Sequence, residues 1–358
     1  MIKIKKFVYF SIFALIINII PFCFTAKTAS AYTMSQAECV IELNSQRVIF
    51  SKNENEKLPM ASTTKILTAL TVIENFDLNK VIIVPKNATN IEGSSIYLRE
   101  GEHLTIKELL YGLMLRSGND CAECLALTCS NNKQEFIDLM NNTAKKYGAT
   151  NSNFVNAHGL HDKNHYTTAY DLCLISLNAM KNPTFKEIVS TKKVEISNEG
   201  YSYKRVLVNK NKMLSTFNGC TGVKTGFTKN AGRCLVSSAE RNGLNFVCVV
   251  INSPQMWERS QELLNTCFEN YKMTQIVNVD DYNNNVYLTT DNKRLNLLMY
   301  KNFSYPIKNS EINDIKIKVN GKNFEDFIKN PKENGIFEVF LENKLIFSQN
   351  IFTIVSNK

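Results

Sequence analysis

Residues 58–73 read LPMASTTKILTALTVI, and this stretch decides the fold. The part that follows Lys65 is apolar nearly all round, which predicts a helix buried at the centre of a domain. Pro59 stands three residues before Ser62, so we expect the helix to begin near the serine. Because residues three apart lie on one face of an α-helix, Ser62 and Lys65 are expected to touch.

Contact between a serine and a lysine indicates nucleophilic catalysis. A serine hydroxyl is a poor nucleophile at neutral pH unless a neighbouring base takes its proton. Lys65 can be that base only if its pKa falls well below that of an ordinary lysine, which burial and nearby positive charge both favour. A serine at a helix N-terminus also lies beside free backbone N–H groups that can stabilise an oxyanion. Taken alone, the pattern more often marks a surface lysine on an ordinary helix, because short motifs recur by chance.

Two further motifs follow in order, Ser117-Gly118-Asn119 and Lys224-Thr225-Gly226. With Ser62-Thr63-Thr64-Lys65 they read S-x-x-K, S-x-N and K-T-G, the set found in penicillin-binding proteins and serine β-lactamases. Lys224 also supplies a positive charge that can lower the pKa of Lys65. The ordered set therefore favours a catalytic role for Ser62.

Longer stretches extend these motifs: LPMASTTK (58–65), LRSGND (115–120), FVNAHGL (154–160), YTTAYD (166–171), GVKTGFT (222–228) and AGRCLV (231–236). On them the chain resembles the low-molecular-weight penicillin-binding proteins, the serine-type D-alanyl-D-alanine carboxypeptidases of peptidase family S11. The likeness runs from about residue 35 to about residue 272 and continues more weakly towards the C-terminus. It implies a β-lactamase/transpeptidase-like fold that needs no metal and no cofactor.

The resemblance implies a catalytic role for four side chains. Ser62 would attack the carbonyl between the two terminal D-alanines of a peptidoglycan stem peptide and form an acyl-enzyme, which water then hydrolyses. Lys65 would accept the serine proton, and Ser117 would relay it to the departing D-alanine amine. Asn119 would hold Lys65 and the substrate amide. β-Lactams mimic the dipeptide end and would acylate the same serine as covalent inhibitors.

The resemblance also implies a clamp for the substrate. Lys224 and Thr225 would grip the terminal carboxylate, and Gly226 would let the strand backbone approach the substrate closely. The backbone N–H groups of Ser62 and Phe227 would form the oxyanion hole.

Two basic residues are candidates for further carboxylate binding. The family often has an arginine in an Asn-Arg-Asn segment before K-T-G, whereas this chain has Asn209-Lys210-Asn211, so Lys210 would act as a point charge without a two-pronged fork. A second family arginine matches Arg259. The alternative for both is a solvated positive surface.

Other functions on the same fold stay open. Class A β-lactamases carry Ser-Asp-Asn and a glutamate that activates the deacylating water, whereas this chain has Ser-Gly-Asn and no recognisable version of that glutamate loop. Carboxypeptidase is therefore favoured over β-lactamase. A D,D-endopeptidase is a variant of the same enzyme, and a non-catalytic wall-binding protein is disfavoured because all the catalytic side chains are present.

The N-terminus predicts export. Lysines at 3, 5 and 6 precede an apolar stretch from Phe7 to about Ala26, and Ala29-Ser30-Ala31 provides a small-residue cleavage site, so residues 1–31 are predicted to be a signal peptide. Removing the four lysines of this segment would leave +5 of the formal net charge of +9. That charge suits contact with an anionic cell wall or a peripheral contact with a membrane surface, and it carries no nucleic-acid signature. A C-terminal amphipathic anchor helix is not expected.

Neither the cysteines nor the histidines predict a metal site. Cys121 and Cys124 form one C-x-x-C pair without a second pair to complete a zinc site, so they are interpreted as buried small residues. His158, His161 and His165 lie close together, but the segment has loop composition and no H-E-x-x-H helix. We expect this segment to be a turn that lines one side of the site.

The order of predicted elements indicates an α+β chain with two domains. The predicted strands are 39–43, 47–50, 233–239 and 244–252, and the predicted helices are 62–75, 105–116, 119–130, 132–147 and 255–270. Strands at both ends imply one antiparallel sheet with helices packed on it and an inserted helical lobe, and the three motifs converge in the cleft between them. We assign residues 32–274 to this catalytic domain. Residues 275–358, with β-rich runs at 285–288, 315–319 and 335–341, are predicted to form a small β-rich domain.

Overall fold

A computed structural model describes residues 35–332 and 334–356. The predicted signal peptide, residues 1–31, lies outside the described residues. All the described residues belong to one compact unit. The division between residues 274 and 275 therefore stays a prediction, whereas the α+β class is confirmed.

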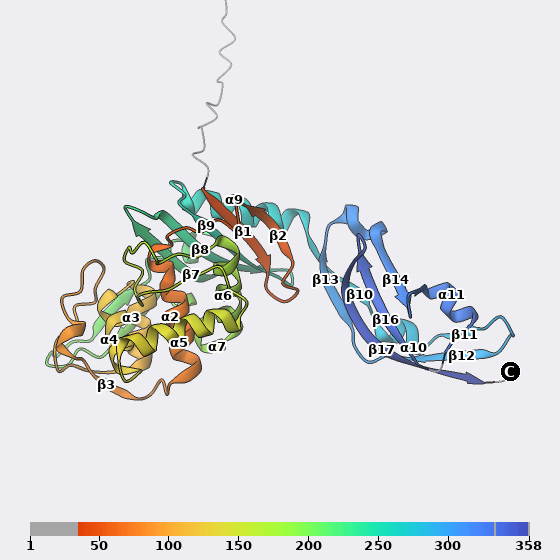
Figure 1. The fold of residues 1–358 in the computed structure, drawn as a ribbon, viewed down its shortest axis with the longest axis horizontal. Helices are drawn as coiled ribbons and strands as arrows, with labels where there is room; N and C mark the ends of the chain where they lie inside the picture. Colours follow the sequence, from red (N-terminus) through yellow and green to blue (C-terminus); the bar gives the residue numbers. More distant parts are fainter. Residues whose placement is uncertain (1–34, 333, 357–358) are drawn as a thin grey trace, which may run out of the picture. The chain divides into compact units, whose positions relative to one another are not determined.

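The main sheet is built from both ends of the predicted catalytic region (Figure 1). Its five strands lie in the order β2-β1-β9-β8-β7, and every neighbouring pair is antiparallel. The bounds are β1 (Ala37–Glu42), β2 (Val48–Lys52), β7 (Cys220–Thr228), β8 (Gly232–Arg241) and β9 (Leu244–Ile251). The predicted strands and hairpins are confirmed, and β7, which carries Lys224-Thr225-Gly226, lies at an edge of the sheet.

Both faces of this sheet are covered by helices. Along β1 the side chains alternate, so Cys39 and Ile41 join one hydrophobic cluster and Val40 joins another. Helix α6 (Ala169–Lys181) packs on β1 and β9, and α9 (Met256–Asn270) packs on β8 and β9. Because it is covered on both faces, β9 reads as a continuous apolar run, with all its residues buried.

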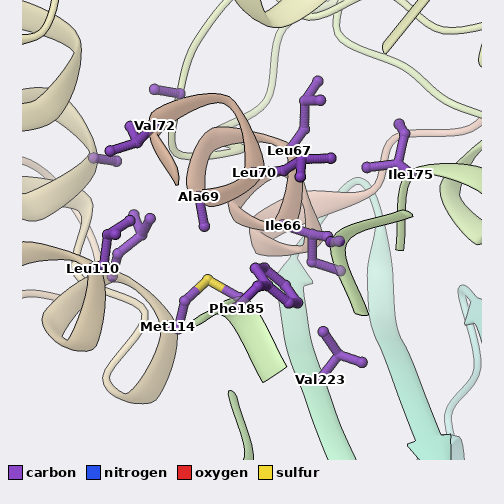
Figure 2. Packing of buried hydrophobic residues seen from close by; sticks show 14 of the residues in the cluster. Ile66, Leu67, Ala69, Leu70, Val72, Leu110, Met114, Ile175, Phe185 and Val223 are labelled. Atoms are coloured by element: carbon purple, nitrogen blue, oxygen red, sulfur yellow. The ribbon is translucent and has the colours of Figure 1, made fainter. Parts of the chain in front are cut away.

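The helical lobe is organised around α2 (Lys65–Asn75), which has apolar residues on most of its surface and buries them in several directions. Figure 2 shows Ile66, Leu70 and neighbouring side chains of this helix among residues of α3, α6, α7 and β7. Truncating one such fully buried leucine to alanine typically lowers stability by about 2–5 kcal/mol. The packing holds the first turn of α2, and with it Ser62, against the edge strand β7.

The remaining helices of the lobe agree with the predicted pattern, except that no range was predicted for α6 or α7. The predicted helices correspond to α3 (Ile106–Leu115), α4 (Asn119–Thr128) and α5 (Lys133–Lys146). Helix α7 (Pro183–Ser190) was not predicted, although its start signal is present: the Asn182 side chain caps the helix and proline follows at the first helical position. The short elements are η2 (Ala61–Thr64), η3 (Lys86–Ala88), α8 (Met213–Thr216), β3 (Val81–Ile83), β4 (His103–Thr105), β5 (Lys193–Ile196) and β6 (Arg205–Val208).

The C-terminal part is β-rich, as predicted. Six strands lie in the order β11-β12-β17-β16-β14-β15, and β10 pairs with β13. Their inward side chains, such as Leu295, Phe337 and Ile351, form a separate hydrophobic cluster. The bounds are β10 (Lys272–Val277), β11 (Val286–Leu288), β12 (Arg294–Leu298), β13 (Phe303–Ile307), β14 (Ile315–Val319), β15 (Lys322–Asn323), β16 (Asn334–Leu341), β17 (Lys344–Ser356), α10 (Val279–Asn283), η4 (Asn309–Asp314) and α11 (Phe324–Lys329). Within the described ranges, no helix has the length and apolar character needed to cross a membrane.

Candidate active site

Ser62 lies in the 3-10 turn η2, directly before α2 begins at Lys65. The Lys65 Nζ is 3.0 Å from the Ser62 Oγ. Ala61, one residue earlier, has a φ of +50°, a left-handed conformation that non-glycine residues adopt only under constraint. The predicted start of the helix near the serine and the predicted contact between Ser62 and Lys65 are both confirmed.

Lys65 is fully buried and surrounded by acceptors. Besides Ser62, its Nζ donates to the Asn119 Oδ1 at 2.7 Å and to the His158 carbonyl oxygen at 2.5 Å. Burial and the positive charge of Lys224 lower the pKa of Lys65 well below its ordinary value. Lys65 can therefore lose its proton at a pH where an exposed lysine cannot, which is what a general base requires.

The second motif is carried by the junction of α3 and α4. Asn119 is the first residue of α4, and its Nδ2 donates to the Glu92 carbonyl oxygen at 2.5 Å, which orients its side-chain oxygen towards Lys65. Ser117 has a φ of +63° and lies almost buried at the wall of a cavity. Constrained backbone of this kind is typical of functional sites.

The Asp120 carboxylate, which the sequence analysis did not single out, holds the loop beside this motif. It accepts from the Ser95 Oγ at 2.5 Å and from the backbone N–H groups of Ile96 and Leu98 at 3.0 and 3.1 Å. The Ser94 carbonyl oxygen in turn accepts from the Asn119 backbone N–H at 2.6 Å. Asp120 thereby fixes the position of the loop against the N-terminus of α4.

The third motif lies on the edge strand β7. Lys224 is buried, its Nζ donates to the Thr225 carbonyl oxygen at 2.9 Å, and burial together with the charge of Lys210 lowers its pKa to about 7. A Cβ added at Gly226 would lie 3.0 Å from the Met60 carbonyl oxygen and 3.1 Å from the backbone nitrogen of Ser62. Glycine therefore allows the strand to approach the serine turn closely, as the resemblance implies.

These elements surround one cavity of about 370 Å³ between the lobe and the sheet edge. Ser62 and Ser117 line it from the helical side, and Thr225, Gly226 and Phe227 line it from β7. The predicted convergence of the three motifs in one cleft is confirmed by this arrangement. The remaining lining residues are Ser94, Lys210, Lys212, Arg233, Met256 and Trp257.

The two additional basic candidates have different positions. Lys210 lines the cavity, and its Nζ donates to the Ser94 Oγ at 2.9 Å. Arg259 does not line this cavity: it lies on α9 beside a separate surface pocket. Its guanidinium donates to both carboxylate oxygens of Glu38, each at 2.8 Å, and to Glu262 at 2.9 Å. This position does not support the substrate-binding role that the resemblance implies, and the Arg259 charge instead compensates the buried Glu38 carboxylate.

Several residues that line the cavity were not predicted from the sequence. Ser94 lies far from every motif in sequence, so no local signal points to it. Arg233 had a usable signal, since the β7–β8 hairpin pairs it directly with Phe227. Met256 and Trp257 enter through the N-terminal turn of α9, which only the packing of that helix on the sheet determines.

The histidine segment lies against the site, as predicted, because the His158 carbonyl oxygen accepts from Lys65. Burial and the charge of Lys65 lower the pKa of His158 to about 3, and burial lowers the pKa of His165 to about 4. Cys121 and Cys124 are buried free thiols on α4, and burial raises the pKa of Cys124 to about 12. Over residues 35–332 and 334–356, no cluster of three or more histidine, cysteine or acidic side chains is arranged to hold a metal ion.

An antiparallel sheet, a helical lobe and a contacting serine, lysine and asparagine between them define the class of serine enzymes that react with penicillin. The family model described as D-alanyl-D-alanine carboxypeptidase matches residues 25–255. The chain thus belongs to the peptidase S11 family of D-alanyl-D-alanine carboxypeptidases.

Individual relatives agree with this assignment. The D-alanyl-D-alanine carboxypeptidase DacF of Bacillus subtilis is 32% identical over 254 residues, which cover 69% of this chain and 65% of the relative. The D-alanyl-D-alanine carboxypeptidase of Streptomyces sp. K15 is 33% identical over 230 residues, which cover 60% of this chain and 79% of the relative. The match to DacF thus spans slightly less than two thirds of that protein.

A solved structure supports the fold over a longer range. The crystal structure of the D-alanyl-D-alanine carboxypeptidase DacD from Francisella tularensis aligns with a TM-score of 0.71, over 90% of this chain and 94% of that one. At 23% identity this likeness is evidence for the fold alone. It includes the β-rich C-terminal part, because the alignment extends beyond the residues matched by the family model.

Proposed function

We propose that this protein removes the terminal D-alanine from peptidoglycan stem peptides through an acyl-enzyme on Ser62. The observation that carries the proposal is the 3.0 Å contact between the Ser62 Oγ and the buried Lys65 Nζ, in a chain of the carboxypeptidase family. Neutral Lys65 accepts the Ser62 proton while the oxygen attacks the carbonyl carbon of the penultimate D-alanine. Asn119 orients Lys65 through its 2.7 Å contact.

The attack places negative charge on the carbonyl oxygen. We assign the stabilisation of this charge to the backbone N–H groups of Ser62 and Phe227, because Gly226 brings the strand next to the serine turn. The carbonyl then re-forms as the C–N bond breaks, and Ser117 passes a proton to the departing D-alanine nitrogen. Water attacks the remaining ester and releases the shortened peptide and free Ser62.

The terminal carboxylate of the substrate meets the positive charges of the cavity. Thr225 and Lys210 line the cavity, and buried Lys224 lies directly behind Thr225 on β7. We propose that these three residues hold the carboxylate and so place the scissile bond over Ser62. A β-lactam, which also carries a carboxylate, acylates Ser62 in the same position.

We further propose that the chain is exported through residues 1–31 and acts on the wall side of the membrane, with residues 32–274 as the catalytic domain and 275–358 as a β-rich accessory domain. The family is one of cell-wall enzymes, and the separate hydrophobic cluster of the C-terminal strands supports the division. Mass spectrometry of the exported protein tests cleavage, for which the expected new N-terminus is Tyr32. Limited proteolysis that cuts near residue 275 would support the domain boundary.

The test of the activity is D-alanine release from a peptide that ends in Lys-D-Ala-D-Ala. Residues 32–358 should release D-alanine and become labelled by a fluorescent penicillin, and the Ser62→Ala variant should do neither. Ser348→Ala, on an exposed strand position of the C-terminal sheet, is the matched control and should behave like the parent. A folded parent that releases no D-alanine contradicts the proposal, and cleavage of cross-linked dimers or of penicillin instead would identify an endopeptidase or a β-lactamase.

A further inference from the structure

The cavity carries more positive charge than one carboxylate requires. Lys210, Lys212 and Arg233 line it, and Lys224 lies buried behind its β7 wall. Among the described residues, no aspartate or glutamate lines the cavity. The proposed carboxypeptidase reaction places the terminal carboxylate of the substrate against Lys224, Thr225 and Lys210, which leaves two of the lining cations without a role.

Arg233 differs from most other arginines of the molecule. Arg47, Arg205 and Arg259 each form an ion pair with a glutamate. Within the part of the chain that the structure describes, the Arg233 guanidinium has no hydrogen bond and no ion pair. Its single aromatic contact is with the Phe227 ring, whose centroid lies 5.6 Å away. The ring positions the guanidinium and leaves its five N–H donors free.

The free guanidinium and the terminal carboxylate clamp are on different elements. Lys210 is attached to the helical lobe, where its Nζ contacts Ser94 and its backbone N–H donates to the Leu115 carbonyl oxygen. Arg233 is the second residue of β8 and pairs with Phe227, and Trp257 of α9 lines the same cavity. A substrate held at one end by Lys210 can therefore present a second acidic group to Arg233.

We propose that Arg233, supported by the charge of Lys212, is a second carboxylate subsite that selects stem peptides with a free carboxylate in addition to the terminal one. This inference rests on the proposed function, because it concerns the same substrate in the same cavity. An arginine fork binds a carboxylate through two parallel hydrogen bonds, whereas a neutral carboxamide offers one acceptor and no charge. Discrimination between the two groups is therefore expected to be about 10-fold to 100-fold in kcat/KM.

The experiment compares two acetylated pentapeptides, L-Ala-γ-D-Glu-L-Lys-D-Ala-D-Ala, one with the free α-carboxylate on the glutamate and one with an α-carboxamide. The parent should release D-alanine faster from the free acid, mainly through a lower KM. Arg233→Ala should lose this preference and keep the parent rate on the amidated peptide, and Arg233→Lys should keep part of the preference. Arg294→Ala is the matched control, because Arg294 is exposed, lies on β12 and makes no ion pair within the described residues.

Benzylpenicillin, which has one carboxylate, reports the integrity of the site and should acylate the parent and all three variants equally. Equal rates of the parent on the two peptides, or a preference that persists in Arg233→Ala, would overturn the inference and leave the carboxypeptidase function standing. No release of D-alanine from either peptide by an acylation-competent parent would overturn both.

Discussion

The region around Ser62 and the C-terminal sheet differ in how far their lysine side chains are exposed to solvent. Behind the walls of the cavity, Lys65 and Lys224 are at most 2% exposed. In the sheet, Lys344 is exposed at the start of β17. Beyond residue 275, the buried polar side chains of the described chain are Glu311, which pairs with Arg47 at 2.6 Å, and Gln349.

The buried lysines around the cavity lower the stability of the fold and serve the reaction, whereas the described part of the C-terminal sheet carries no such buried lysines. Burying an ammonium group is unfavourable unless it is compensated, and two neighbouring lysines add their mutual repulsion. Among its described residues the C-terminal sheet buries no lysine, and along β16 buried residues alternate with exposed or half-buried ones.

The largest effect is expected from removing the base. Lys65→Met should lower the rate of acylation by penicillin about 10²-fold to 10⁴-fold, the usual contribution of general-base catalysis. Its free energy of unfolding should change by no more than about 3 kcal/mol, because relief of the buried ammonium group offsets the loss of a donor to Asn119 and His158. Lys344→Met in the C-terminal sheet should change neither quantity. A Lys65→Met enzyme that acylates at more than a tenth of the parent rate would show that another group accepts the proton.

The next effect concerns the dependence of acylation on pH. Lys65 must be neutral to accept a proton, so the rate of acylation should rise as the pH increases through the lowered pKa of Lys65. Lys224 must be charged to hold the carboxylate, so substrate binding should weaken above the Lys224 pKa of about 7. In Lys224→Met, loss of the positive neighbour raises the pKa of Lys65, and the rising limb should move to higher pH. Stopped-flow acylation across pH 5–10 measures both limbs. An unmoved rising limb would contradict electrostatic coupling between the two lysines.

The same lysine predicts how stability depends on pH. The pKa of Lys224 is about 7 in the folded chain, whereas an ordinary lysine has a pKa of 10.5. Between pH 7 and pH 10.5 the unfolded chain therefore binds more protons at this residue than the folded chain does. The free energy of unfolding should therefore rise as pH increases from about 7 towards 10. Lys224→Met should remove this contribution, and Lys344→Met should leave it in place. Chemical denaturation at several pH values measures the slopes, and parallel slopes in parent and Lys224→Met would contradict the assignment.

A smaller effect on activity is expected from moving β7 away from the turn that carries Ser62. In Gly226→Ala the new methyl group would press on the backbone at Met60 and Ser62 and move β7 away by a few tenths of an ångström. We expect kcat to fall about 10-fold to 100-fold through a poorer oxyanion hole. Gly335→Ala in β16 presses on the Val319 and Ile351 side chains and should lower stability by about 1–3 kcal/mol without changing kcat. Equal kcat losses in both variants would indicate a general structural effect.

The smallest effect on activity is expected at Arg259. Arg259→Leu leaves the buried Glu38 carboxylate without its partner and should lower the free energy of unfolding by about 3–5 kcal/mol. The kcat/KM per folded molecule should stay within twofold of the parent, because Arg259 lies outside the cavity. A raised KM with unchanged stability would restore the substrate-binding role that the resemblance implies. Urea denaturation and steady-state kinetics on the same preparation distinguish the two outcomes.

The sequence predicted local features well because local physical chemistry determines them. The apolar run after Lys65 permitted only a buried helix, and the i, i+3 spacing placed Lys65 on the same face as Ser62. Short β-rich runs between turn residues predicted β1, β2, β8 and β9 of the main sheet and β11, β14 and β16 of the C-terminal part. Helix α7 was not predicted, although the Asn182 cap and the proline that follows it are a recognisable helix start in the sequence.

Residues that reach the site from distant elements could not be predicted in this way. Ser94 reaches the cavity because Asp120 anchors its loop, a contact over more than 20 residues that no periodicity encodes. Arg259 was assigned to the substrate from its match to a family arginine, whereas the packing of α9 turns it towards Glu38. The direction in which a helix presents a given side chain depends on which face of the helix is buried, and the whole fold determines that face.

The residue pattern alone was enough to propose which groups carry out the chemistry: a serine, a lysine three residues later, and two motifs that supply Asn119 and Lys224. The contact between Ser62 and Lys65 follows from their covalent spacing on a helix, whereas the roles of Asn119 and Lys224 follow from the resemblance to the family. The tertiary structure decided the state of those groups. Only packing buries Lys65 fully and brings Lys224 close enough to lower the pKa of Lys65. Packing also leaves Arg233 without an acidic partner among the described residues. The dielectric environment of a group and its distances to other charges arise only when elements distant in sequence meet.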